Sequence, residues 1–270
     1  MTTLNVPGAT LYYEVKGTGP LLLMIPGGPA DAGAFAGLAP FLSDRYTVVP
    51  YDPRGNSRSV VDDPSKDQDM DVHGDDAAAL IAALTSEPAY VLGSSGGAQI
   101  GLNLAARHPE RLHTLVAHEP PCAPMLPDAA DALAGMEDTY QTYRAQGVEA
   151  GMKRFELVIG IDRAEQLAQV EPTPEMLEDW ARIGGNLEYF LAHGVRQISG
   201  YAPDVAALRG GPARIVVGVG ETSAGQLAHR TALALAERLG TPPVTFPGDH
   251  GGFGSHSAEF AETLHKVLTG

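Results

Sequence analysis

The stretch Tyr90-Val91-Leu92-Gly93-Ser94-Ser95-Gly96-Gly97-Ala98 decides the fold. It follows the pattern G-x-S-x-G at Gly93, Ser95 and Gly97, with an apolar run before it and a helix-forming run after it. This context is typical of a strained strand-to-helix turn that lifts a serine hydroxyl above a sheet, while the glycines leave room for the turn. The helix start would also offer unpaired N–H groups to a developing negative charge. We therefore predict that Ser95 is a nucleophile at the end of a buried strand.

The rest of the chain alternates short apolar runs with helical patterns, as in a parallel sheet covered on both faces. The expected strands are Thr10–Val15, Leu21–Ile25, Thr47–Tyr51, Tyr90–Gly93, Thr114–His118, Arg214–Val219 and Val244–Phe246. The expected helices are Ala32–Leu42, Val72–Ser86, Gly97–Arg107, Ala224–Leu239 and Ser257–Leu268. The expected fold class is therefore α/β, with a mostly parallel, doubly wound sheet.

The segment from Met125 to Pro203 interrupts this alternation. Its helical patterns lie at Ala129–Ala145 and Met176–His193, and it contains no convincing strand. Open parallel sheets bind ligands at the carboxyl ends of their strands, so an all-helical insertion there would shape a pocket. We predict a helical lid at residues 125–203, inserted into a core formed by residues 1–124 and 204–270.

His250 is the histidine best placed to act as a general base. A serine hydroxyl is a weak nucleophile at neutral pH, so a base must take its proton. His250 lies in Pro247-Gly248-Asp249-His250-Gly251-Gly252-Phe253, a turn-rich loop between the last expected strand and the last expected helix. Other histidines lie on expected helices or in a helix-ending His-Pro pair: His73, His229, His265 and His108.

Main-chain donors for an oxyanion are expected after the buried strand Leu21–Ile25. This strand runs into Pro26-Gly27-Gly28-Pro29. Pro29 has no N–H, so Gly28 is the natural donor, and it would be joined by Gly96 directly after the nucleophile. Losing one such donor typically costs about 3–4 kcal/mol of transition-state stabilisation.

Taken together, these residues resemble the α/β-hydrolase family over nearly the whole chain outside the lid. The segment from Asp52 to Ser59 is similar to the family's D-x-R-G-x-G-x-S, and the segment from Arg107 to Leu112 is similar to its usual helix-to-strand connection. The resemblance implies the α/β-hydrolase fold, with its nucleophile at Ser95 and its histidine at His250. It also places the lid after the family's sixth strand. Pro26 stands where many members carry histidine, which should not disable an oxyanion hole made of backbone.

The third member of the triad departs from the family pattern. Members commonly carry an aspartate in a G-x-x-D pattern after the seventh strand, and this chain has Ser223 at that position. Glu119, at the end of the sixth strand, is the favoured acid, because haloalkane dehalogenases of this superfamily can carry theirs there. Glu221 is the alternative acid. Both satisfy the chain order of serine, acid and histidine.

The neighbours of Glu119 predict a well-held backbone. Pro120 and Pro121 follow it, and proline fixes φ and biases the residue before it toward extended geometry. His118 should point to the opposite side of the strand and is expected to be structural.

Composition limits the partners and the compartment. The chain has 270 residues, of which 44% are hydrophobic and 19% charged, as in a globular protein with one sizeable core. Its net charge of −15 argues against nucleic acid and anionic membrane surfaces as partners. No apolar segment follows Met1 and no long apolar run occurs, so neither a signal peptide nor a membrane span is expected. Cys122 is the single cysteine, which fits the cytoplasm, and the histidines show no metal-ligand spacing.

The predicted function is hydrolysis of a carboxylic ester or related acyl bond of a small molecule, with no cofactor and no metal. A serine nucleophile argues against dehalogenase and epoxide hydrolase action, which use an aspartate at the elbow. Gly27-Gly28-Pro29 and Asp52-Pro53-Arg54-Gly55 are similar to proline iminopeptidases, whose aminopeptidase action would need lid carboxylates such as Glu171, Glu175 or Glu178. A cofactor-free haloperoxidase-like enzyme with the same triad and a non-catalytic ligand receptor are further alternatives. A homodimer is an open alternative for the assembly.

Overall fold

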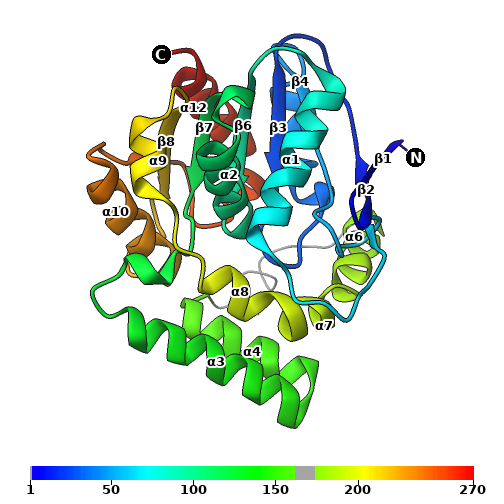
Figure 1. Cartoon of the computed structure of the whole chain (residues 1–270), viewed down its shortest axis with the longest axis vertical. Coiled ribbons are helices and arrows are strands. Elements are labelled where there is room, and N and C mark those ends of the chain that lie inside the picture. The colour runs from blue at the N-terminus through cyan, green and yellow to red at the C-terminus, as the bar shows by residue number, and fades with distance from the viewer. Residues whose placement is uncertain (1, 162–173) are drawn as a thin grey trace.

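A six-stranded parallel sheet forms the centre of the molecule (Figure 1). The computed structural model describes the backbone of residues 2–161 and 174–270, and their side chains except those of residues 174–176. The strand order is β4-β3-β6-β7-β8-β9, and every neighbouring pair is parallel. The strands are β3 (Leu21–Ile25), β4 (Thr47–Pro50), β6 (Ala89–Ser94), β7 (Leu112–His118), β8 (Arg214–Gly220) and β9 (Val244–Phe246). The expected α/β fold class with a mostly parallel sheet is confirmed.

A small antiparallel sheet lies beside the main one. It consists of β1 (Thr2–Val6), β2 (Ala9–Tyr13) and β5 (Val60–Val61). Gly8, with a φ of 77°, makes the turn of the β1–β2 hairpin, which requires a positive φ. The expected strand Thr10–Val15 therefore belongs to this hairpin and ends at Tyr13, where a bridge to Tyr51 connects it to the edge of the main sheet.

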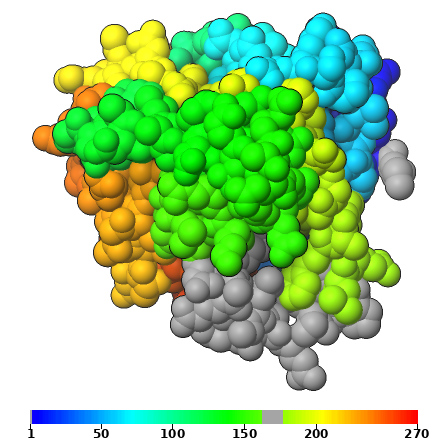
Figure 2. All heavy atoms as spheres, turned by 90° about the horizontal axis from the view of Figure 1, so that it is seen from below, coloured from blue at the N-terminus to red at the C-terminus, as the bar shows by residue number. Residues whose placement is uncertain are grey.

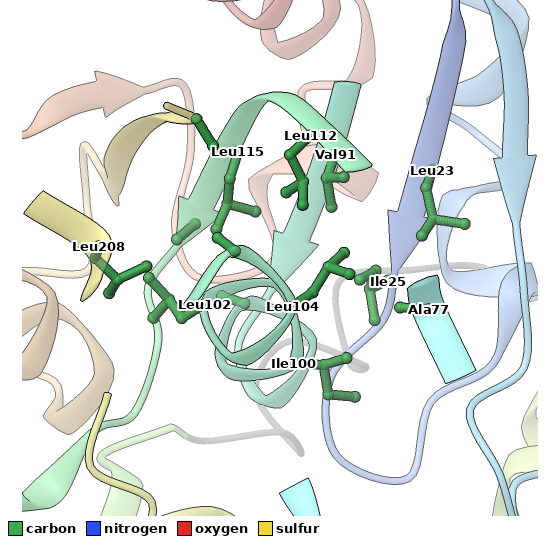
Figure 3. Packing of buried hydrophobic residues seen from close by; sticks show 14 of the residues in the cluster. Leu23, Ile25, Ala77, Val91, Ile100, Leu102, Leu104, Leu112, Leu115 and Leu208 are labelled. Atoms are coloured by element: carbon green, nitrogen blue, oxygen red, sulfur yellow. The ribbon is translucent and has the colours of Figure 1, made fainter. Parts of the chain in front are cut away.

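Helices cover both faces of the main sheet. Alternate residues of β3 point to opposite faces, so that Leu23 and Ile25 belong to one core cluster and Leu22 and Met24 to the other. The first cluster packs under α1 (Met70–Leu84), α2 (Gly96–Arg107), α9 (Val205–Gly210) and α10 (Leu227–Leu239); the second packs against α12 (Ser257–Thr269). Figure 3 shows the first cluster, in which side chains of α2 such as Leu102 and Leu104 lie between leucines of the strands and Leu208 of α9. The sheet is thus doubly wound, as expected.

The expected helix Ala32–Leu42 is wrong. Two short 3₁₀ turns, η1 (Ala32–Phe35) and η2 (Ala39–Phe41), replace it. Glycines at positions 33 and 37 and a proline at position 40 lower the helix propensity of this segment. Its apolar side chains Phe35, Leu38 and Leu42 are nevertheless fully buried, so the spacing that suggested a helix reflects real burial.

In the described part of the chain between β7 and β8, every regular element is helical. These elements are η4 (Ala123–Met125), α3 (Ala129–Gln146), α4 (Val148–Ile159), α6 (Pro174–Gly184), α7 (Leu187–Tyr189), a π-helical turn at Phe190–Gly194, α8 (Val195–Ser199) and α9. The expected helix Met176–His193 is therefore wrong as one element, because Gly184-Gly185 ends α6 and a turn precedes α7. Figure 2 shows the molecule from below. On this face α3 and α4, in green, lie at the centre, between α10 in orange and α6 and α7 in yellow-green. None of the described helices is both long and apolar enough to cross a membrane.

Candidate active site

Ser95 occupies a sharp turn between β6 and α2. It is the N-cap residue of α2, and its backbone has φ 55° and ψ −124°, a region that residues with a side chain rarely enter. Such a conformation costs on the order of 1–3 kcal/mol and persists only where the surroundings fix it. The turn places Ser95, half-buried, in the wall of a cavity at the carboxyl ends of the strands.

Close packing around this turn explains its glycines. A Cβ atom at Gly93 would lie 2.4 Å from the carbonyl oxygen of Gly97, and one at Gly97 would lie 2.1 Å from the carbonyl oxygen of Ile25. Any side chain at either position would force the strand and helix apart. The G-x-S-x-G pattern therefore reflects steric need on both sides of Ser95.

Glu119 and His250 come together from two distant loops. Glu119 directly follows β7, His250 follows β9, and His250 Nδ1 lies 2.6 Å from Glu119 Oε2. Glu119 is fully buried, which by itself opposes its ionisation. The pKa of Glu119 is nevertheless lowered to about 2, because burial is outweighed by the hydrogen bond and charge of His250 and by donors from Ser223 and the Gly220 amide. The carboxylate is therefore ionised beside the imidazole.

The alternative acid, Glu221, does not make this contact. Glu221 is exposed in the turn after β8, where its amide donates to the carbonyl oxygen of Phe246. Ser223, at the position where the family usually has aspartate, is fully buried and its hydroxyl donates to Glu119 Oε1. The Gly220 amide donates to the same oxygen at 2.9 Å. The usual acid position thus supplies a hydrogen-bond donor to a carboxylate that comes from another strand.

The backbone of Glu119 differs from the expectation. Its φ is 49°, whereas the prolines behind it were expected to favour extended geometry. Proline disfavours the right-handed helical region for the residue before it, but it leaves the left-handed region open when other contacts enforce a sharp exit from the sheet. The Glu119 amide continues the ladder to Gly218 at 3.0 Å, and its carboxylate is fixed on both oxygens. These bonds outweigh the local preference.

Two backbone amides face the cavity beside Ser95. A Cβ atom at Gly96 would lie 3.2 Å from the Gly28 nitrogen, so the two residues are neighbours in space. Within the described chain, neither the Gly28 nor the Gly96 amide donates a hydrogen bond to another protein group. Gly96 is buried at the start of α2 and Gly28 is half-buried beside it, and unpaired N–H groups in such places are uncommon, so the pair indicates a site for an anionic oxygen.

The cavity between the sheet and the helical segment has a volume of about 260 Å³. Gly28, Ser95, Gly96 and His250 all line it. Most of its wall is apolar, and the helical segment supplies most of the large apolar side chains: Met136, Phe155, Ile159, Ile183, Phe190 and Ile198. Among the described lining residues there is no Asp, Glu, Lys or Arg. Within the same described ranges, no three His, Cys, Asp or Glu side chains are grouped as metal ligands would be.

No hydrogen bond joins Ser95 to His250 in the part of the chain that the structure describes. Catalytic hydrogen bonds are often long without substrate and tighten in the reacting complex. The two residues nevertheless line the same cavity.

His118, the residue before Glu119, lies in the protein core behind the site. It is fully buried, its ring packs edge-on against Phe246 and Phe260, and its centroid lies 6.4 Å from that of His250. In the described chain neither of its ring nitrogens has a hydrogen-bond partner. Burial lowers the pKa of His118 to about 4; the charge of Glu119 raises it by a smaller amount, and His250 lowers it slightly further. His118 is therefore held neutral inside the core, consistent with the structural role expected for it.

Replacing His118 with phenylalanine should make the stability of the protein less sensitive to acid. Because its folded-state pKa of about 4 lies below the ordinary value of 6.5, the unfolded chain binds more protons between these values. Stability is therefore lost as the pH falls from 6.5 toward 4, by about 1.4 kcal/mol per pH unit for this group. Urea denaturation at pH 7 and pH 5 should give a difference in unfolding free energy that is about 2 kcal/mol smaller for His118→Phe. An equal difference in both proteins would contradict this account.

The roles of three polar residues around the site were not predicted from the sequence. Asn56 and Asn186 donate to carbonyl oxygens of the loop that contains Gly28, and Ser223 donates to Glu119. Only Ser223 had a signal, since it stands at the usual acid position. Asn56 lies in the recognised segment Asp52–Ser59 but at one of its variable positions, and Asn186 lies in no recognised motif.

Known proteins resemble this chain along its whole length. A family model described as the alpha/beta hydrolase fold matches residues 20–156. The uncharacterized hydrolase YraK of Bacillus subtilis is 38% identical to this chain, over 98% of this chain and 95% of its own length. Among solved structures, the enol-lactonase from Burkholderia xenovorans has a TM-score of 0.77 at 20% identity and covers 100% of both chains. A bromoperoxidase from Bacillus anthracis has a TM-score of 0.78 at 20% identity, over 97% of this chain and 96% of its own. At these identities the two structures show a shared fold.

Proposed function

Because the chain belongs to the alpha/beta hydrolase fold family, we propose that it is a serine hydrolase that cleaves an uncharged carboxylic ester or related acyl bond. The observation that carries the proposal is the arrangement around the cavity. Ser95 stands on a strained turn, the buried Glu119–His250 pair lies at the same wall, and the unpaired amides of Gly28 and Gly96 lie beside the serine. Each part supplies what acyl transfer to a serine needs.

In the proposed mechanism, Ser95 Oγ attacks the substrate carbonyl carbon while its proton passes to His250 Nε2. Glu119 accepts the Nδ1–H of His250, which fixes the tautomer and stabilises the imidazolium that forms. The carbonyl oxygen becomes an oxyanion and accepts from the amides of Gly28 and Gly96. When this intermediate collapses, the bond to the leaving alcohol breaks and His250 returns the proton to that alcohol. Water then attacks the acyl-enzyme by the same route and releases the acid and Ser95.

The helical segment supports the expected lid. We assign residues 125–203 to a lid over a core formed by residues 1–124 and 204–270. Its side chains Met136, Phe155 and Phe190 line the cavity that contains Ser95. The lid would exclude water and select the substrate by shape, as is usual for small-molecule sites.

The apolar wall favours neutral substrates over amines. An aminopeptidase would need a carboxylate to bind the substrate ammonium, because an unpaired charge in such a cavity is costly. Of the carboxylates expected for that role, Glu178 is exposed and does not line the cavity. Glu171 and the side chain of Glu175 lie outside the described residues. The described wall therefore supports ester hydrolysis more strongly than aminopeptidase action.

A panel of substrates tests the proposed specificity. We expect turnover of p-nitrophenyl esters of short and medium neutral acids. The matched ester with a terminal carboxylate, mono-p-nitrophenyl succinate, should be cleaved about 100-fold more slowly in kcat/KM, which is ~2.7 kcal/mol. Amino-acyl p-nitroanilides, including that of proline, should be cleaved more slowly still. Preference for the prolyl anilide would favour an aminopeptidase, and halogenation with peroxide that outpaces ester cleavage would favour a haloperoxidase. Binding of the neutral esters without turnover would favour a receptor.

A further inference from the structure

We propose that Asn56 and Asn186 are positioning residues that hold the oxyanion-binding amide of Gly28. We further propose that Asn186 makes this amide depend on the helical segment over the cavity. The inference rests on the proposed function, because it assigns a role to residues that do not touch the reacting atoms. Asn186 would connect the helical segment over the cavity to the Gly28 amide, which would stabilise the transition state.

The loop that contains Gly28 is held mainly through its carbonyl oxygens. Asn56 Nδ2 donates to the carbonyl oxygens of Gly28 at 3.0 Å and Ala30 at 2.8 Å. Asn186 Nδ2 donates to the carbonyl oxygen between them, that of Pro29, at 2.8 Å. Three consecutive carbonyl groups of the loop are thus fixed by two side-chain amides.

These bonds determine the direction of the Gly28 N–H. The peptide planes on both sides of Gly28 are rigid, so its orientation depends on the two rotations at Gly28 itself, where φ is 52°. Glycine enters this region freely and leaves it as freely. The Ala30 amide holds the plane before Gly28 through the Gly27 carbonyl at 3.0 Å, and Asn56 holds the plane after it. The Gly28 N–H lies in the first of these planes, so its direction depends on Ala30 staying in place. Asn56 also donates to the Ala30 carbonyl oxygen, so without Asn56 both the second plane and Ala30 lose a restraint, and the N–H direction is less well fixed.

Asn186 connects this loop to the helical segment. It is 5% exposed and lies in the turn between α6 and α7. Its Oδ1 accepts from the Ser57 amide at 2.7 Å, and its Nδ2 donates to Ser57 Oγ at 2.8 Å as well as to the Pro29 carbonyl. One side chain thus joins the turn of the helical segment to two loops of the core.

The backbone of Ser57, which Asn186 contacts, has a strained conformation. Ser57 stands where the pattern D-x-R-G-x-G-x-S has its second glycine, yet it keeps a φ of 49°. A serine in this region costs on the order of 1–3 kcal/mol and needs external contacts to stay there. Asn186 supplies two of these contacts, and Ser57 Oγ supplies another by donating to Asp31 at 2.7 Å.

An ion pair between Arg182 and Asp31 connects the end of α6 to the loop that contains Gly28. Arg182, one turn before Asn186, donates to both carboxylate oxygens of Asp31, at 2.5 and 3.2 Å, and also to Asp179. Asp31 is fully buried and follows Ala30 in the Gly28 loop. The helix end is therefore anchored by charge at Asp31, while Asn186 reaches the carbonyl next to Gly28. If Asn186 is lost, the ion pair of Arg182 should still hold the end of α6, so the loss should affect mainly the carbonyl group next to Gly28.

The test compares Asn56→Ala and Asn186→Ala with Asn103→Ala. Asn103 is a matched control, because it is also buried and its side-chain amide donates a hydrogen bond, but to Asp71 Oδ1 at 2.7 Å, outside the Gly28 loop. With p-nitrophenyl butyrate, we expect kcat of the two test variants to fall about 10- to 100-fold while KM stays within about threefold. The Ki of phenylboronic acid, which forms a tetrahedral adduct with the serine, should rise by a similar factor.

The outcomes separate this inference from the proposed function. Hydrolysis that survives Ser95→Ala would overturn the proposed function itself. If Ser95→Ala is inactive but both test variants keep kcat and boronate affinity within about threefold of Asn103→Ala, the positioning role is overturned. A rise in KM alone, with unchanged boronate affinity, would overturn it as well. Melting curves give the folded fraction of each variant, and if Asn56→Ala does not fold, Asn186→Ala decides the question alone.

Discussion

The Ser95→Ala variant is expected to lose ester hydrolysis by on the order of 10⁵-fold or more in kcat, because residues that act as one catalytic unit lose nearly all function singly. The residual rate would come from binding and from the amides of Gly28 and Gly96. His250→Ala should be comparably inactive for the same reason. Initial rates with p-nitrophenyl butyrate measure both variants.

The fold of Ser95→Ala should remain intact. Ser95 Oγ makes no hydrogen bond to the described part of the protein, and alanine meets the same φ of 55° with a similar strain. The melting temperature should therefore change by less than about 3 °C. The exposed Ser255, outside the cavity wall, provides the control variant Ser255→Ala, with activity near that of the original protein. Activity of Ser95→Ala above about a tenth of the original would refute the assignment of the nucleophile.

The Glu119→Gln variant is expected to lower kcat by about 10³- to 10⁴-fold. Glutamine has the size of glutamate but carries no charge, so it cannot stabilise the imidazolium of His250. It also has one acceptor oxygen, whereas Glu119 uses two, one toward His250 and one toward Ser223 and the Gly220 amide. The amide group of glutamine must therefore face either His250 or the Gly220 N–H with a donor. With the NH₂ toward His250, Nδ1 must accept and the productive tautomer is lost; with the NH₂ toward Gly220, two donors oppose each other and the side chain is displaced from its position.

The Glu221→Gln variant is the matched control. Glu221 is exposed, so its amide variant should cost less than about tenfold in kcat, or ~1.4 kcal/mol. Steady-state kinetics of both variants on one ester decides between the two carboxylates. If Glu221→Gln is the inactive variant, the acid has been assigned wrongly.

The environment of Glu119 also has a consequence for stability. Its pKa of about 2 in the folded protein lies below its ordinary value of 4.5, so its ionised form stabilises the fold at every pH above that value. This contribution is lost as the pH falls from 4.5 toward 2. It therefore acts in a more acidic range than the contribution of His118, whose pKa is about 4 against an ordinary 6.5. As the pH is lowered, the free energy of unfolding should therefore fall first through the protonation of His118 and then through that of Glu119.

The sequence predicted those parts of the site that have local signals. Gly93, Ser95 and Gly97 form a local G-x-S-x-G pattern between a strand and a helix, and His250 lies in a loop whose place follows from the order of strands and helices. Glu119 could be chosen over Glu221 only by analogy, because the contact to His250 spans 131 positions of the chain.

The missed features depend on tertiary packing. Asn186 contacts Ser57 across 129 positions and Pro29 across 157, and no local pattern marks such contacts. The apolar spacing of Phe35, Leu38 and Leu42 gave the correct burial but the wrong helix, because hydrophobic periodicity reports which side chains are buried and not which hydrogen bonds the backbone makes. The positive φ of Glu119 was missed since several long-range bonds outweigh the preference of a residue before proline.

Covalent labelling tests directly whether Ser95 is the nucleophile. The protein is treated with a fluorophosphonate, its intact mass is measured, and the modified peptide is sequenced by tandem mass spectrometry while esterase activity is followed. We expect one adduct per chain, located on Ser95, with loss of activity in proportion to labelling and no adduct in Ser95→Ala. An adduct on another residue, or full ester hydrolysis by a protein that takes up no label, would contradict this assignment.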